Sequence, residues 1–245
     1  MFNHWPYPFW IAHRGAGKLA PENTLAALRL GAQYGYRAFE CDVKLSADGL
    51  PFLLHDATLE RTTPERGIAA ERPWAELSRL DAGGWHSRAY AGEPPPSLAA
   101  VAQFVRRNAY SLNIEIKPTP GAEGETGHVV AREVARLWQG DRPLPLLSSF
   151  RPESLQAARA EAPALPRALL LDTLWAGWED IAAQLQCAAV VCNHTLYDQA
   201  LVDRLHAAGL RALAYTVNDP APAQWLIGLG VDGLITDAVD RFSPA

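Results

Sequence analysis

Two acidic residues, Glu40 and Asp42, stand one residue apart in the segment Phe39–Lys44, where polar and apolar residues alternate. Side chains of a strand alternate between its faces, so both carboxylates point to one side, with about 7 Å between their Cα atoms. Like charges this close raise a carboxylate pKa unless a cation lies nearby. Lys44 could supply part of that charge, but oxygen ligands suit a hard metal ion better.

A histidine is predicted to return towards these carboxylates. Residues Ser46–Gly49 have the composition of a turn, and Leu50–Leu54 reads as a second short strand that ends at His55 and Asp56. A hairpin of this kind places His55 close to the acidic pair.

The same alternation recurs in the segment Asn113–Lys117, where Glu115 and Lys117 share one face of a predicted strand. If this strand neighbours the first, Glu40, Asp42 and Glu115 converge and form an oxygen-ligand site for one divalent cation, Mg²⁺ or Ca²⁺. The alternative is a network of lysine–glutamate ion pairs that fills the protein interior. The repeated pattern beside histidines favours the metal site.

His13 and Arg14 directly follow the apolar run Phe9–Ala12. A single histidine at a strand end is often only a core residue, but His13 together with His55 could act as general acid and general base. The planar guanidinium of Arg14 suits a phosphoryl oxygen, and Lys117 could neutralise another. A metal, two cationic side chains and two histidines indicate displacement at the phosphorus of a phosphate ester.

Composition sets bounds on the protein class. The chain has 245 residues, 49% hydrophobic and 20% charged, which is typical of a folded protein with a substantial core. Its net charge of −5 argues against a nucleic-acid binder. The first residues have no basic signal region, and no segment reaches the ~20 apolar residues of a membrane span, so we expect a cytoplasmic protein without stable membrane association.

Eight predicted strands, nearly all followed by a helix, indicate a closed parallel (β/α)8 TIM barrel rather than an open sheet. The first helix is expected from about Asn23 to Tyr34. No glycine-rich nucleotide-binding turn opens it. The strands are expected at Trp10–Ala12, Ala38–Val43, Ser111–Lys117, Leu144–Phe150, Ala168–Leu171, Ala188–Cys192, Ala212–Val217 and Gly233–Ile235.

One stretch interrupts this alternation. Residues from about 56 to 96 contain several prolines and glycines and show no sustained period of a strand or a helix. We interpret it as a small inserted subdomain after the second strand, within a single domain that spans residues 1–245.

The order of the motifs resembles that of the glycerophosphodiester phosphodiesterase family, over nearly the whole chain. No single motif is decisive, but their combination is specific. The matching motifs are His13-Arg14-Gly15, Pro21-Glu22-Asn23-Thr24-Leu25, Phe39-Glu40 with Asp42-Val43, Asp48-Gly49, His55-Asp56 with Thr58-Leu59 and Arg61-Thr62-Thr63, Leu80-Asp81-Ala82-Gly83 with Trp85, Asn113-Ile114-Glu115-Ile116-Lys117, Ser149-Phe150, Thr216-Val217-Asn218 and Gly230–Asp237.

This resemblance implies a barrel with an inserted subdomain and a metal-dependent hydrolase of small-molecule glycerophosphodiesters, such as deacylated phospholipids. Glycerol 3-phosphate and an alcohol would be the products. By the same resemblance, His13 and His55 form the acid–base pair, Arg14 and Lys117 bind phosphate, and Glu40, Asp42 and Glu115 bind the cation.

Two positions call for separate interpretation. Glu22 either orients Arg14 or a histidine, or is simply an acid favoured in the first turn of a helix. The family usually has tryptophan before Thr-Val-Asn, and Tyr215 stands there in this chain. This change concerns the shape of the substrate pocket rather than the chemistry.

Two other functions remain as alternatives. One is a phospholipase D-like lyase that acts on intact lipids and forms a cyclic phosphate; it would need a lipid-docking surface, and no basic amphipathic segment is visible. The other is a non-catalytic phosphodiester-binding barrel, which would be expected to have lost one of the histidines or carboxylates.

Overall fold

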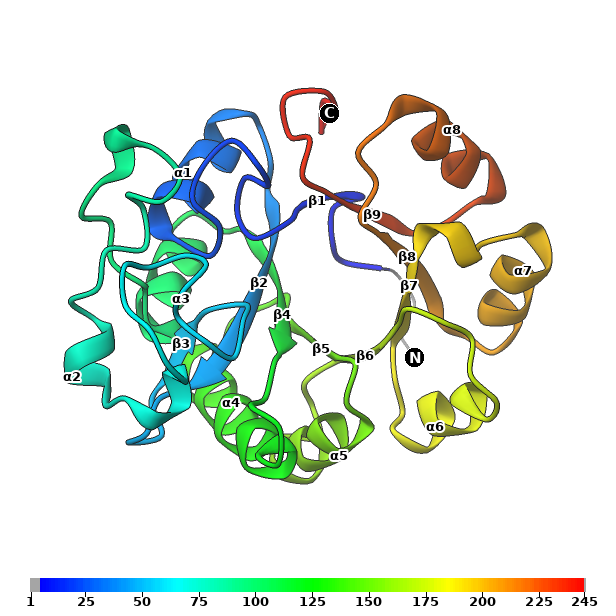
Figure 1. Cartoon of the computed structure of the whole chain (residues 1–245). Helices are drawn as coiled ribbons and strands as arrows, with labels where there is room; N and C mark the ends of the chain where they lie inside the picture. Colours follow the sequence, from blue (N-terminus) through cyan, green and yellow to red (C-terminus); the bar gives the residue numbers. More distant parts are fainter. Residues whose placement is uncertain (1–4, 245) are drawn as a thin grey trace.

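A closed barrel of parallel strands forms the body of the computed structural model, which describes residues 5–244 (Figure 1). β1 pairs with both β2 and β9, and this pairing closes the ring. The predicted (β/α)8 barrel is therefore confirmed. Within residues 5–244 the barrel strands are β1 (Trp10–Ala12), β2 (Ala38–Leu45), β4 (Ser111–Ile116), β5 (Leu146–Ser149), β6 (Arg167–Leu171), β7 (Ala189–Asn193), β8 (Arg211–Tyr215) and β9 (Gly233–Thr236).

Helices surround the barrel and cover the outer face of its strands (Figure 1). Their buried residues recur at helical spacing, as Leu98, Val101, Ala102 and Val105 do in α3. The Ser97 hydroxyl caps the first turn of this helix by accepting a hydrogen bond from Ala100 N. The covering helices are α1 (Leu25–Gln33), α3 (Leu98–Arg107), α4 (Glu123–Leu137), α5 (Pro152–Glu161), α6 (Trp178–Gln184), α7 (Gln199–Ala207) and α8 (Pro220–Leu229), with a short 3-10 turn η3 (His194–Leu196) before α7.

The first helix begins two residues later than the sequence predicts. Asn23 has φ of 58°, in the left-handed region, and so cannot belong to the helix. Thr24 is the N-cap instead, with its hydroxyl accepting a hydrogen bond from Ala27 N at 3.1 Å. The asparagine is thereby free to make a different contact, which is described below.

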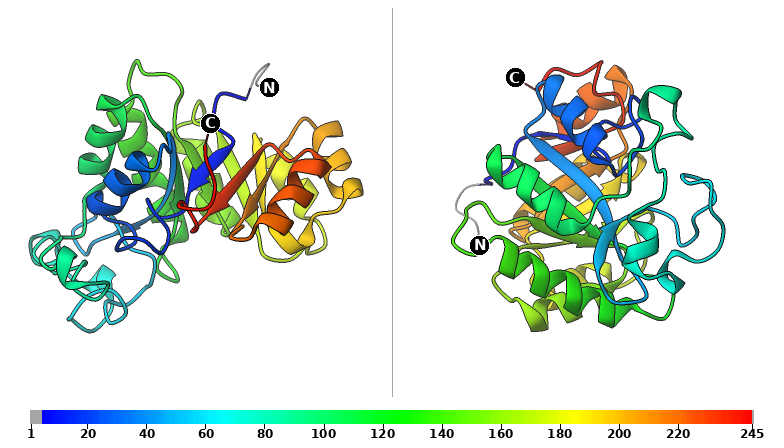
Figure 2. Two further views of the ribbon diagram at one scale, coloured as in Figure 1. Left: turned by 90° about the horizontal axis from the view of Figure 1, so that it is seen from above. Right: turned by 90° about the vertical axis from the view of Figure 1, so that its left-hand side faces the viewer.

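The segment between β3 and α3 extends from one end of the barrel (Figure 2). β3 (Pro51–Leu53) pairs antiparallel with β2, as the predicted hairpin requires. Only short helical pieces follow it, namely η1 (Ala69–Glu71), α2 (Trp74–Leu77) and η2 (Arg88–Tyr90). Phe52, Leu54, Leu59, Ala69 and Leu77 form a separate small core beneath this segment.

The barrel interior is divided into a polar side and an apolar side. Strand register places Glu40 beside Asn113, Asp42 beside Glu115, and Glu115 beside Ser148, so polar side chains line β2, β4 and β5. Apolar side chains, mostly from β6 to β9, fill the rest of the interior in a buried cluster that includes Ile11, Ala38, Leu146, Ala168, Leu170, Ala189, Val191, Leu213 and Ile235.

Helix α1 packs unusually closely on the loop after β1. A Cβ on Gly31 would lie 2.1 Å from the carbonyl oxygen of Gly15 and 2.9 Å from the Phe39 ring. Gly15 itself has φ of +100°, a conformation that favours glycine. These two glycines hold the loop that carries His13 and Arg14 against the helix.

We expect Gly31→Ala to destabilise the protein by about 1–3 kcal/mol, because the added methyl group forces the loop away from the helix. Gly228→Ala in α8 is the matched control, since nothing lies within 4 Å of its added Cβ. That variant should be more stable by about 0.5–1 kcal/mol through helix propensity alone. Urea unfolding measures both changes, and equal stabilisation of the two variants would contradict the close packing.

Candidate active site

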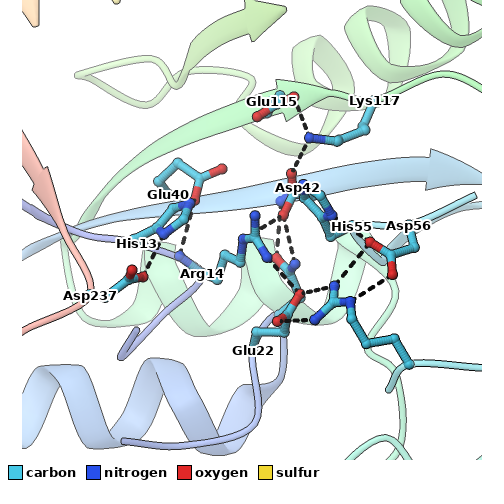
Figure 3. A network of polar contacts seen from close by, with 12 residues as sticks. His13, Arg14, Glu22, Glu40, Asp42, His55, Asp56, Glu115, Lys117 and Asp237 are labelled. Atoms are coloured by element: carbon cyan, nitrogen blue, oxygen red, sulfur yellow. Dashed lines mark hydrogen bonds and ion pairs between the residues drawn. The ribbon is translucent and has the colours of Figure 1, made fainter. Parts of the chain in front are cut away.

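The three carboxylates that the sequence predicts to converge do lie together, as part of a network of polar contacts (Figure 3). Glu40 and Asp42 come from β2 and Glu115 from the neighbouring β4. One oxygen atom from each residue lies within 4.8 Å of the others. Glu40 and Asp42 are buried, and Glu115 is nearly so.

Burial makes this cluster a strong attractor for a cation. Burial and the charge of Asp42 raise the pKa of Glu40 to about 8 and the pKa of Glu115 to about 7. Among the described residues, Glu40 Oε1 has no hydrogen-bond partner. An all-oxygen ligand set with one unpartnered buried carboxylate oxygen fits a hard divalent cation.

Asp42 is held ionised by neighbouring cations. Although burial opposes ionisation, Arg14 and Lys117 keep the pKa of Asp42 below its usual range. Arg14 Nε lies 3.3 Å from Asp42 Oδ2, and Lys117 Nζ lies 3.4 Å from Asp42 Oδ1. Lys44, which could supply part of the positive charge, donates a hydrogen bond to the Lys117 carbonyl at 2.9 Å, and burial lowers its pKa to about 8.

Arg14 is positioned by its backbone as well as by its side chain. Its φ of 50° lies in the left-handed region, which residues other than glycine rarely adopt. In this conformation its backbone N–H donates to Glu40 Oε2 at 3.0 Å. Strained residues of this kind gather at functional sites, where surrounding contacts hold them.

His13, which directly follows β1, is oriented by Asp237, which directly follows β9. Its Nδ1 lies 2.6 Å from Asp237 Oδ1, and its Nε2 lies 3.7 Å from Glu40 Oε2. Burial alone would lower the pKa of His13, but the hydrogen bond with Asp237 and the charge of Glu40 outweigh it and raise the pKa.

His55 is oriented in the same way by the residue that follows it. Its Nδ1 lies 2.6 Å from Asp56 Oδ1. Here burial is the largest influence, and together with the charges of Arg14 and Lys117 it lowers the pKa of His55 despite the opposing charge of Asp42. The two histidines therefore have pKa values shifted in opposite directions, an arrangement that can serve one acid and one base.

Two cavities among the described residues meet at His13 and Arg14. The inner cavity, of about 180 Å³, lies in the barrel mouth and is lined by His55, the glutamates of the cluster and Lys117. The outer cavity, of about 300 Å³, lies on the other side of His13 and includes Trp85 and Asp237. Larger hollows exist between the outer helices, and they contain none of the predicted site residues.

Comparison with known proteins decides the family. The model of the glycerophosphoryl diester phosphodiesterase family matches residues 13–241. The glycerophosphodiester phosphodiesterase of Caldanaerobacter subterraneus is 32% identical over 232 residues, which cover 93% of each chain. The chain belongs to the glycerophosphoryl diester phosphodiesterase family. It is accordingly a hydrolase of glycerophosphodiesters, and the predicted family and enzyme class are confirmed.

Solved structures of this family share the fold closely. An Oleispira antarctica phosphodiesterase in complex with the product sn-glycerol-3-phosphate is 36% identical and superposes with a TM-score of 0.91, covering 96% of this chain and 95% of the other. A glycerophosphodiester phosphodiesterase from Agrobacterium tumefaciens is 28% identical with a TM-score of 0.81, covering 97% and 100%.

Glu22 links Arg14 to the residues around His55. The helix begins at Leu25, so Glu22 is not a first-turn acid. Instead it accepts hydrogen bonds from Arg14 Nη1 at 2.8 Å and from Arg61 Nη1 at 2.7 Å. Arg61 also donates to Asp56, which places one arginine between the glutamate beside Arg14 and the aspartate beside His55.

The sequence predicts no specific role for four residues of this network: Asp56, Arg61, Asp237 and Asn23. Asn23 donates to Asp42 Oδ2 at 2.8 Å and accepts from Asp42 N at 3.0 Å. Asp56 could have been found, because it follows a candidate catalytic histidine directly. The role of Asp237 follows only once the barrel closes and β9 lies beside β1.

Aromatic residues form one wall of the inner cavity. Phe150 and Tyr215 both line it, and their rings meet edge to face with centroids 5.8 Å apart. Tyr215, which replaces the usual tryptophan, donates its hydroxyl hydrogen to Leu171 O at 3.2 Å.

None of the helices formed by residues 5–244 has the length and hydrophobicity that crossing a membrane demands.

We expect Glu115→Gln to weaken binding of Mn²⁺, a paramagnetic substitute for Mg²⁺, at least tenfold, because an amide is a poorer ligand than a carboxylate for a hard cation. Electron paramagnetic resonance titration of free Mn²⁺ measures this affinity without turnover. Glu153→Gln, which alters an exposed glutamate on α5, is the control and should bind Mn²⁺ as the unmodified protein does. Equal affinities for all three proteins would exclude Glu115 as a ligand.

Proposed function

We propose that this phosphodiesterase hydrolyses glycerophosphodiesters to glycerol 3-phosphate and an alcohol with one divalent cation and two histidines. Glu40, Asp42 and Glu115 would hold the cation, Mg²⁺ or Ca²⁺. The observation that carries the proposal is the position of His13 between the two cavities, with the carboxylate cluster on its inner side. The product bound by the Oleispira antarctica relative supports this assignment.

The phosphoryl group would lie in the inner cavity, where Arg14 and Lys117 offer positive charge. The guanidinium of Arg14 can pair with two oxygens at once, and the ammonium of Lys117 with a third. When bound, the cation would supply further positive charge for the phosphoryl oxygens as charge develops on them. The ion pairs that Arg14 and Lys117 make with Asp42 keep both cations pointed into this space.

Proton transfer follows from the placement of the histidines. His55 faces only the inner cavity and accepts the proton of the attacking oxygen, while His13 faces both cavities and donates a proton to the alcohol oxygen as its bond to phosphorus breaks. Asp56 binds Nδ1 of His55 and Asp237 binds Nδ1 of His13. Nε2 of each imidazole is therefore left for the reaction. The proton taken by one histidine balances the proton given by the other.

The alcohol would leave through the outer cavity, to which the segment between β3 and α3 contributes. Trp85 and His86 from this segment line the cavity opposite His13. We therefore propose that residues 1–245 act as one domain in which residues 56–96, as an inserted subdomain, complete the substrate pocket.

The function is tested with a panel of glycerophosphodiesters, assayed for glycerol 3-phosphate with Mg²⁺, with Ca²⁺ and after exhaustive chelation. We expect turnover of at least one diester with a divalent ion and a loss of at least 100-fold on chelation, restored by adding the ion back. Phosphorus NMR should show a linear product; a cyclic phosphate as final product would support the lyase instead. Full activity after chelation would remove the cation from the proposal.

The two histidines are distinguished by the leaving group. His13→Gln and His55→Gln should each lower kcat for glycerophosphocholine by about 10²–10⁴-fold. A p-nitrophenyl diester of glycerol phosphate releases p-nitrophenolate, which leaves without needing a proton. With this substrate His13→Gln should recover most of its lost kcat, and His55→Gln should recover none. Recovery in the wrong variant, or in both, would overturn the assignment of acid and base.

A further inference from the structure

The floor of the inner cavity carries buried polar atoms that the proposed chemistry does not use. Asn113 is 4% exposed and Ser148 is fully buried, and both line this cavity. Within the described part of the chain, Asn113 Oδ1, Asn113 Nδ2 and Ser148 Oγ have no hydrogen-bond partner. Buried polar side chains are nearly always hydrogen-bonded in native proteins, so a partner from outside the chain is expected.

That partner must lie in the inner cavity, because the barrel beneath is filled. Asn113 reaches a second space below, but it measures only about 10 Å³ and is walled mostly by apolar side chains such as Tyr7, Ile11, Leu146 and Leu213. The space above, of about 180 Å³, has roughly the liquid volume of six water molecules. Only the upper cavity is large enough to hold part of a substrate.

The two unpartnered side chains lie next to the carboxylate cluster, on the same side of the barrel. Asn113 is the register neighbour of Glu40, and Ser148 is the register neighbour of Glu115. Their amide and hydroxyl groups offer both donors and acceptors, whereas a carboxylate that holds a cation only accepts. This is the combination that a hydroxyl group needs, since it donates one hydrogen bond and accepts others.

The rest of the cavity lining is mainly apolar. It is formed by Phe150, Leu170 and Ile235, by Tyr215, whose hydroxyl is already bonded to Leu171 O, and by Thr216, which adds one hydroxyl. The cavity thus has one side rich in hydrogen-bonding groups and one mainly apolar side. A short polyol fits it well, with its hydroxyl groups on the first side and its C–H groups on the second.

We propose that Asn113 and Ser148 bind the free hydroxyl groups of the glycerol half of the substrate and thereby select glycerol over simple alkyl phosphodiesters. The inference rests on the proposed function, which places the phosphoryl group at Arg14 and Lys117, and it adds the groups that recognise the rest of the product. Both residues act in specificity, and proton transfer remains with the histidines.

The test compares substrates that differ only in glycerol hydroxyls. Glycerophosphocholine is assayed beside 2-hydroxypropyl, 3-hydroxypropyl and propyl phosphocholine, which share its leaving group. We expect kcat/KM of the unmodified enzyme to fall at least tenfold when one or both hydroxyls are missing. Asn113→Leu and Ser148→Ala should each lower kcat/KM for glycerophosphocholine about 10- to 100-fold. Each variant should change kcat/KM less than threefold for the substrate that lacks the hydroxyl bound by the altered residue.

Ser149→Ala is the matched control for Ser148→Ala. Ser149 is the next residue of β5, equally buried, but its hydroxyl donates to Ile116 O and does not line the cavity. This variant should keep the preference for glycerol unchanged. If Asn113→Leu does not fold, Ser148→Ala alone still decides, because it removes only one oxygen atom.

A binding measurement separates this inference from the proposed function. Calorimetric titration with glycerol 3-phosphate and with propyl phosphate requires no turnover, and the unmodified protein should prefer the former at least tenfold. Loss of that preference in the variants supports the proposal even if the diester panel shows no hydrolysis. An equal loss for substrates with and without hydroxyls, or no loss at all, would overturn it, since the side chains would then merely support the carboxylates or bind water.

Discussion

Mutual repulsion of three carboxylates in the barrel interior is the constraint around which this protein is built. Glu40 and Asp42 are buried and Glu115 is nearly so, and burial limits how far water can screen their charges. The fold provides two permanent cations, Arg14 and Lys117, and both lie against Asp42. They keep Asp42 ionised, but the pKa values of the two glutamates remain raised, so the cluster still favours a further positive charge, which a divalent ion would supply.

The contacts around this cluster connect groups that are distant in sequence. His13 approaches Glu40 and is held by Asp237, while His55 is held by Asp56. Arg61 then links Asp56 to Glu22, and Glu22 in turn holds Arg14. Both histidines and Arg14 therefore have a second residue that fixes their orientation, which is what a preorganised site requires.

Much of this arrangement could be predicted from the sequence because it depends on strands with strict alternation. The period of two in Phe39–Lys44 and Asn113–Lys117 gave the shared face of the carboxylates, and the parallel barrel made those strands neighbours. Contacts that depend on backbone conformation could not be predicted in this way. The left-handed φ of Asn23 moves the start of α1 and frees its side chain for Asp42, and no periodicity signals that change.

The hydrogen bond between His13 and Asp237 spans 224 positions of the chain and joins the first barrel strand to the last. During synthesis the histidine emerges early and its aspartate almost at the end. His13, the proposed general acid, consequently acquires its orientation only when β9 pairs with β1 and closes the ring. Under the proposed function, phosphodiester cleavage therefore depends on closure of the ring, and forms of the chain in which β9 is not paired with β1 would have no oriented acid.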